Sequence, residues 1–242
     1  MRSIFLKEIN TFFSSLIGYI AVGVFLLATG LFMWVFPDTS IIDYGYATLD
    51  QLFSIAPNIF LFLIPAITMR SFAEEQQSGT MELLATRPLS DAAIIGGKFW
   101  ASVALVGVAL VPTLLYYVSV YTLGDPVGNI DTGAVIGSYV GLMLLAAAFT
   151  AIGVFASSLV TNQIVAFLMG MMLCFGLYMG FEYISKLPFG IGIEDKIALL
   201  GMNAHYDALG RGNILLADIV YFVSVIIFFL ALTRYQLQKR KF

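Results

Sequence analysis

The chain has 242 residues, of which 60% are hydrophobic and only 11% are charged, and its formal net charge is −3. Soluble domains carry about 25% charged residues, so a water-soluble fold is excluded, because a chain of this length could not bury so much apolar surface. The apolar stretches are continuous and about 20 residues long, as helices that cross a membrane require, whereas β-barrel strands alternate in segments of about ten residues. We therefore expect an all-α polytopic membrane protein that forms one domain, residues 1–242.

Residues 1–15 predict a short amphipathic helix that lies in the membrane interface. The apolar side chains at helical spacing on one face are Ile4, Phe5, Ile9, Phe12, Phe13 and Leu16. Polar side chains, among them Ser3, Lys7 and Asn10, occupy the other face. A helix of this kind can rest in the headgroup region before the chain enters the bilayer. The alternative is that these residues are only a cytoplasmic lead into the first span.

Six apolar stretches predict six membrane-spanning helices. They are Leu16–Phe36, Phe53–Met69, Phe99–Tyr121, Gly133–Ser157, Ile164–Tyr183 and Ile214–Thr233. The first is longer than the apolar region of a signal peptide, so we expect it to be retained as a helix.

The basic residues predict the orientation of these spans, since Lys and Arg gather in cytoplasmic loops. One side of the predicted membrane carries Arg2, Lys7, Arg70, Arg87, Lys98, Arg234, Lys239, Arg240 and Lys241. The opposite loops carry only Lys186, Lys196 and Arg211, all in the last of them. Both termini and residues 70–98 are therefore expected in the cytoplasm.

The cytoplasmic segment 70–98 predicts a helix, a break and a second, short helix. The first contains Glu74 and Glu75 and ends at Ser78-Gly79. Thr80 then caps the second helix, "MELLATR", which stops before the proline that follows it. This second helix presents Met81, Leu84 and Ala85 on one face, with Glu82 and Arg87 in its first and last turns, where their charges suit the helix dipole.

An apolar-faced helix exposed to the cytoplasm can seat in a groove on a soluble partner protein. The alternative is a solvated hairpin that only connects two spans. Ser90-Asp91 is expected to cap the helix that runs into the third span.

Small residues at intervals of four predict close helix packing in the fourth and fifth spans. They are Gly133, Gly137 and Gly141 in one and Gly176 and Gly180 in the other. Such faces let helices approach each other closely in lipid. Contacts inside the chain and contacts with a second subunit both fit the pattern.

Residues 182–213, before the last span, form an unusually apolar outer loop. It contains "KLPFGIGIEDKIALLG", in which Pro188 and three glycines interrupt the apolar residues. Non-helical backbone at membrane depth is tolerated where protein or water surrounds it. We expect short re-entrant helices here.

The sequence offers no catalytic, metal or cofactor residues that we would select. Ionisable residues inside the spans would be the functional candidates, and almost none are present. His205 is the one histidine, and we expect it to bond to a neighbour at the outer interface. The nearest approach to a phosphate loop is Gly97-Lys98, which lacks both the earlier glycine and the following Ser or Thr. If ATP drives this protein, another chain binds it.

The run "RSFAEEQQSGTMELLATRPLSDAAIIGGK" resembles the signature of ABC-2 type permeases, the export family of ABC transporter membrane subunits. "HYDALGRGNILLADIVYF" resembles that family's lead into its last span. Several stretches, including "KEINTFFSSLIGYI", "FLIPAITMRSFAEE" and "IGVFASSLVTNQIVAF", are similar to the gliding-motility-associated permease subunits of Bacteroidetes. The resemblance covers essentially the whole chain.

This resemblance implies a membrane subunit in the bacterial inner membrane that binds no cofactor itself, with ATP-Mg held by a partner. The implied partners are a cytoplasmic ABC ATPase dimer, a second membrane subunit (a gliding-motility auxiliary subunit or a second copy) and the lipid bilayer, with no nucleic acid. The ATPase would push a coupling helix at about Thr80–Arg87. The implied coupling residues are Glu74, Glu75, Thr80, Met81, Glu82, Leu84 and Arg87, with Lys7 and Glu8 on the first helix. The alternative function is a membrane scaffold that anchors motility machinery without moving a solute.

Overall fold

Long helices packed side by side form the structure, a computed structural model that describes residues 1–242 except 38, 81–89, 188–193 and 240–242. Within these residues the chain is helical, without strands. The helices are α1 Arg2–Phe13, α2 Leu16–Trp34, α3 Ile41–Tyr44, α4 Asp50–Thr68, α5 Arg70–Gln77, α7 Asp91–Leu110, η1 Val111–Thr113, α8 Leu114–Leu123, α9 Thr132–Leu159, α10 Gln163–Phe175, η2 Gly176–Gly180, α11 Phe181–Ser185, α12 Glu194–Ala198, α13 Met202–Leu209 and α14 Leu216–Lys239.

Five continuous helices in the described residues are long and apolar enough to cross a membrane. They are Asp50–Gln77, Asp91–Leu123, Thr132–Leu159, Gln163–Ser185 and Leu216–Lys239. The helices α1 and α2, bent by 70° relative to each other, raise the number to six if the pair counts as one span. The predicted number of six is therefore the upper value by length and composition.

The second and third spans are longer than their apolar stretches predict. The second continues beyond Met69 through α5 to Gln77, and the third begins at Asp91. Backbone hydrogen bonding continues past the point where the side chains turn polar, because the helix does not depend on an apolar environment. Ser90 starts the third span, since its side chain accepts a hydrogen bond from the Ala93 N–H, as predicted.

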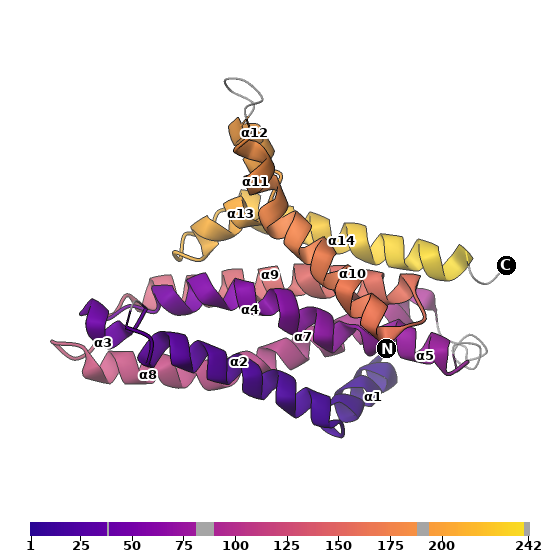
Figure 1. The fold of residues 1–242 in the computed structure, drawn as a ribbon, viewed down its shortest axis with the longest axis horizontal. Helices are drawn as coiled ribbons and strands as arrows, with labels where there is room; N and C mark the ends of the chain where they lie inside the picture. Colours follow the sequence, from indigo (N-terminus) through magenta and orange to yellow (C-terminus); the bar gives the residue numbers. More distant parts are fainter. Residues whose placement is uncertain (38, 81–89, 188–193, 240–242) are drawn as a thin grey trace.

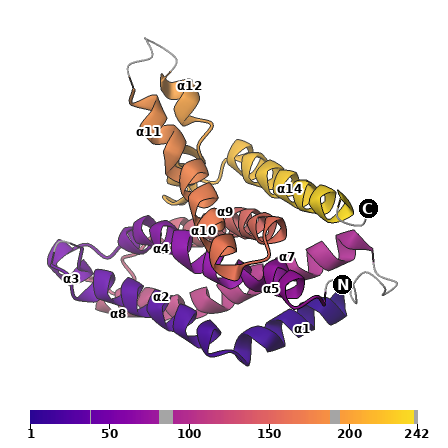
Figure 2. The same ribbon diagram turned by 45° about the vertical axis from the view of Figure 1, so that its right-hand side comes forward.

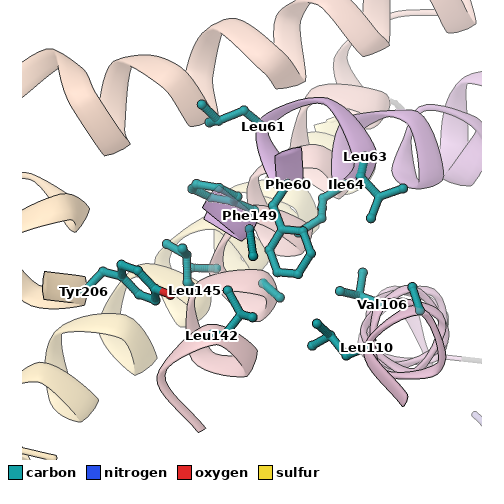
Figure 3. Close-up of a cluster of buried hydrophobic side chains, with 14 of the residues drawn as sticks. Phe60, Leu61, Leu63, Ile64, Val106, Leu110, Leu142, Leu145, Phe149 and Tyr206 are labelled. Atoms are coloured by element: carbon teal, nitrogen blue, oxygen red, sulfur yellow. The ribbon is translucent and has the colours of Figure 1, made fainter. Parts of the chain in front are cut away.

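The helix α9 is the central element of the bundle, and it packs against α4, α7, α10, α13 and α14. Figure 3 shows Phe149 of α9 beside Phe60 of α4, with Leu142 and Leu145 lining the same interior. Tyr206 reaches this core from α13, and its hydroxyl donates to the Phe53 carbonyl at 2.7 Å. These contacts bury α9 on most of its circumference.

The start of α1 and the end of α14 lie at the same end of the bundle, together with α5 (Figure 1). We call this the terminal end, and the end that carries α3 the opposite end. The helix α1 is the predicted amphipathic helix, and it packs on the start of α7, where Ile4 is buried against Gly97.

The segment before the last span contains the short helices α12 and α13. Short helices are predicted here, and their re-entry into the membrane stays a prediction. The helix α13 packs back against α9. The helix α10 also packs on α9 and α4, but α11, which follows it, leads away from the bundle and places α12 clear of it (Figures 1 and 2). The fifth span is not α-helical throughout, because Gly176–Gly180 form a π-helical turn.

Candidate functional site

A buried network of ion pairs joins three helices at the terminal end of the bundle. Lys98 of α7 is 1% exposed, and its Nζ lies 2.8 Å from Glu8 Oε1 and 3.0 Å from Glu75 Oε1. The Lys7 ammonium donates to the same Glu75 oxygen at 2.9 Å. We call Lys7, Glu8, Glu75 and Lys98 the ion-pair network; it connects α1, α5 and α7.

The charges of the network balance, which permits their burial. Two lysines face two glutamates, and the two members most withdrawn from water, Lys98 and Glu75, carry opposite charges, while Lys7 stays half exposed. The Lys98 ammonium also lies 5.1 Å from the centre of the Phe72 ring, a favourable cation–π distance. At Lys7, burial lowers the pKa of the ammonium, but its hydrogen bond to Glu75 and the nearby carboxylates outweigh this and hold the pKa above its usual value.

The helix α5 is held in place by a side chain from α9. Ser157 Oγ accepts hydrogen bonds from the backbone N–H groups of Phe72 and Ala73, at 3.0 and 3.1 Å. The same hydroxyl donates to the Met69 carbonyl at 2.9 Å. The first N–H groups of a helix have no partner within it, so Ser157 acts as a cap from a distant part of the sequence. It fixes the direction in which α5 leaves α4.

The predicted coupling residues divide into three groups in the structure. Lys7, Glu8 and Glu75 come together in the ion-pair network, whereas Glu74 is exposed and forms no ion pair in the described residues. The predicted break after α5 is present, since Gly79 has a φ of +69°, and the Thr80 hydroxyl lies 2.9 Å from that of Ser78. The remaining residues, Met81, Glu82, Leu84 and Arg87, lie outside the described residues, so the helix expected there stays a prediction.

Sequence reasoning missed Lys98 as a member of the site. We used it only to orient the spans and to reject a phosphate loop. A usable signal was present: a lysine surrounded by apolar residues at the start of a span must find an opposite charge. Its partners Glu8 and Glu75 are 90 and 23 positions away in sequence (98 − 8 and 98 − 75), so the sequence did not identify them.

Two of the predicted packing glycines make close contacts inside the chain. A Cβ on Gly141 would lie 2.5 Å from Leu209 Cβ, and one on Gly137 would lie 2.7 Å from the Gly212 carbonyl oxygen. At Gly176 and Gly180 no described atom lies within 4 Å of the Cβ position, and Gly133 meets only the nearby Asp131 side chain. The packing roles of these last three stay predictions.

Within α13, the His205 side chain bonds to groups before and after this helix in the sequence. Its Nδ1 lies 2.7 Å from Asp218 Oδ1 and its Nε2 lies 3.0 Å from the Leu199 carbonyl oxygen. The imidazole stacks on Tyr221 with a centroid separation of 3.9 Å. These contacts tie α13 to the start of α14, which agrees with the structural role expected for this histidine. The described residues hold no group of three or more His, Cys, Asp or Glu side chains arranged for a metal ion.

Comparison with known proteins identifies one match. A family model described as ABC-2 family transporter protein matches residues 4–240. The matched region runs from α1 to α14 and includes all four residues of the ion-pair network. A comparison with curated proteins found no match.

Proposed function

The chain belongs to the ABC-2 family of transporter proteins, and from this premise we propose that it is the permease subunit through which a separate ATPase drives export. Its apolar helices make it a multi-pass membrane protein, and its family assigns it to the membrane subunits of ABC transporters. We propose that it lies in the bacterial inner membrane with the terminal end in the cytoplasm. ATP-Mg is then bound by the partner, not by this chain.

The ion-pair network is the observation that supports coupling to an ATPase. The helices α5 and α7 lead into and out of residues 78–90, the segment expected to receive the ATPase. Glu75 and Lys98 join these two helices across a buried contact of 3.0 Å, and Glu8 adds α1 to the same contact. A push on the segment therefore acts on both spans together, because contiguous packed elements carry such displacements.

We propose further that a second permease chain completes the transport pathway and that the complex serves gliding motility. This finer assignment is supported by the similarity of several stretches to gliding-motility permease subunits. A chain with up to six spans has half of the membrane spans expected for an ABC exporter. We therefore expect a homodimer or a heterodimer with an auxiliary subunit.

Co-purification with the cognate ATPase tests the proposal. Leu84→Asp places a charge on the apolar face of the expected coupling helix, and Glu75→Lys reverses a charge in the network. Each variant is expected to insert in the membrane but to retain the ATPase at least about tenfold less well, a loss of about 1.4 kcal/mol. Asp43→Lys changes an exposed charge at the opposite end and serves as the control.

Wild-type ATPase retention and ATP turnover in both Leu84→Asp and Glu75→Lys would contradict the proposal. Stimulation of ATP turnover by an added solute in the reconstituted complex would support transport. ATP turnover that no added solute changes, together with loss of the ATPase from the variant complexes, would instead indicate the membrane scaffold.

A further inference from the structure

A cavity of about 210 Å³ lies beside the ion-pair network, between α1, the α4–α5 pair and α7. Its charged lining consists of Lys7, Glu8, Arg70, Glu74, Glu75 and Lys98. Its apolar lining consists of Phe12, Ala66, Ile67 and Leu105. One cavity thus combines a polar end and an apolar end.

The order of these side chains along the helices gives the cavity a direction. Going from the terminal end into the bundle, α7 presents Lys98, then Ser102, then Leu105. The α4–α5 pair presents Glu75, then Arg70, then Ile67 in the same direction. Because these helices are membrane spans, the charged part lies at the level of the membrane surface and the apolar part lies deeper. This is the arrangement of a headgroup and its acyl chains in a lipid.

Two charged groups in the cavity have polar atoms without a partner. Glu75 is 6% exposed, and its Oε1 is shared by Lys7 and Lys98, but its buried Oε2 has no hydrogen-bond partner in the described residues. Arg70 Nε is also buried without a partner there. Buried polar atoms are nearly always satisfied in folded proteins. Glu75 Oε2 and Arg70 Nε would both be satisfied by a ligand that donates a hydrogen bond to the carboxylate and accepts one from the guanidinium.

We propose that this cavity binds the headgroup of a phospholipid with a primary amine, such as phosphatidylethanolamine. The ammonium supplies N–H donors for Glu75 Oε2, and the phosphate accepts from the Arg70 guanidinium, whose planar donors suit phosphate oxygens. The volume is below the roughly 300–1,000 Å³ of pockets for drug-sized ligands. It holds a headgroup, while the acyl chains pass Phe12 and Ile67 into the bilayer.

Binding of this lipid does not depend on the ATPase, because the cavity is formed by this chain alone. The lipid is a resident ligand that fills the space between α1, α5 and α7. The choice of amine is specific: the quaternary ammonium of phosphatidylcholine carries no N–H donor and cannot satisfy Glu75 Oε2.

Native mass spectrometry of the purified full-length permease, without ATPase, tests the proposal. Phosphatidylethanolamine, phosphatidylcholine and phosphatidylglycerol are titrated separately, and the retained lipid is counted. We expect phosphatidylethanolamine to be retained at least about tenfold more tightly than the other two, which corresponds to about 1.4 kcal/mol. Glycerophosphoethanolamine, the headgroup without acyl chains, is expected to bind far more weakly.

Glu75→Gln is expected to reduce retention of phosphatidylethanolamine to the level of phosphatidylcholine, because the amine loses its carboxylate partner. Arg70→Gln is expected to weaken retention of all three lipids, because their phosphates lose the guanidinium. Arg70 lies outside the ion-pair network, so its variant tests the site without removing the contacts between α5 and α7. Arg211→Gln, an exposed arginine near the far end of α9, is the matched control and should leave retention unchanged. Equal retention of the three lipids, wild-type retention of phosphatidylethanolamine in folded Arg70→Gln, or equal binding of the water-soluble headgroup would overturn the proposal.

Discussion

At Lys98, α7 carries an ammonium that is almost fully withdrawn from solvent within the first two turns of a membrane span. An isolated charge there would be costly, and the lysine is accommodated because two carboxylates lie within 3.0 Å of it. Burial of a paired charge adds little stability by itself, but removal of one partner leaves a buried charge that is no longer compensated. The network therefore favours the one arrangement of α1, α5 and α7 in which all four charged groups meet.

Lys98→Met is therefore expected to destabilise the protein by about 3 kcal/mol, at the lower end of the range for broken buried ion pairs. The lower end applies because Lys7 remains beside Glu75 and is half exposed. Thermal unfolding in detergent measures the effect. Lys196→Met, at an exposed position of α12, is the control and should unfold at the wild-type temperature. Equal unfolding temperatures for the two variants would show that the network adds no stability.

Among the elements, the junction of α4 and α5 depends on Ser157 of α9. The hydroxyl satisfies two backbone N–H groups and one carbonyl at the point where the apolar helix continues as a polar one. Gln76 strengthens the attachment, since its Nε2 donates to the Ser158 carbonyl at 3.2 Å. Through these bonds α5 and the end of α9 form one unit.

Ser157→Ala should cost about 1–3 kcal/mol, because the buried N–H groups of Phe72 and Ala73 lose their acceptor. Faster hydrogen exchange is expected at these amides in particular. Ser119→Ala is a suitable control, since that hydroxyl bonds only to a carbonyl four residues earlier. Unchanged exchange at both amides would argue against the capping role.

Gly141 at the contact between α9 and α13 and Gly176 in the π-helical turn are expected to respond oppositely to substitution by alanine. Gly141→Ala places a Cβ 2.5 Å from Leu209 Cβ, and overpacking of this kind costs about 1–3 kcal/mol. Gly176→Ala meets no described atom within 4 Å and gains helix propensity, so it is expected to be neutral or stabilising by up to about 1 kcal/mol. The unfolding temperatures of the two variants provide the comparison. A drop for Gly176→Ala of the same size would contradict this account.

For the molecule as a whole, the arrangement in Figure 1 places α3 and α5 at opposite ends of the bundle. The basic-residue pattern predicts that the α5 end faces the cytoplasm. Accessibility of the two ends to a reagent that does not cross membranes therefore reports the orientation directly.

Single cysteines in a Cys174→Ser background test this assignment, since Cys174 is the one native cysteine. A membrane-impermeant maleimide is expected to label Tyr46→Cys in intact spheroplasts, because this exposed residue follows α3. Ser78→Cys, exposed after α5, should be labelled only once the membrane is disrupted. The reverse pattern would invert the orientation and remove the basis for ATPase docking at the terminal end.

The sequence alone determined the class of the protein and most of its helices. Continuous apolar stretches, the cap at Ser90, the break at Ser78-Gly79 and the amphipathic pattern of residues 1–15 are local properties, and each corresponds to a feature of the structure. Hydropathy could not determine the ends of the second and third spans, because α5 and the start of α7 remain helical after the side chains become polar.

Only the tertiary structure decided which charges meet. Lys7, Glu8, Glu75 and Lys98 lie on three helices, and the sequence separates them into three unrelated positions. An ion pair depends on distances of a few ångströms between atoms of different elements, and those distances follow from how α1 and α5 pack against α7. The same packing creates the cavity with its unpaired Glu75 oxygen and the cap from Ser157. The helices are local consequences of the chain, whereas the site is a consequence of their assembly.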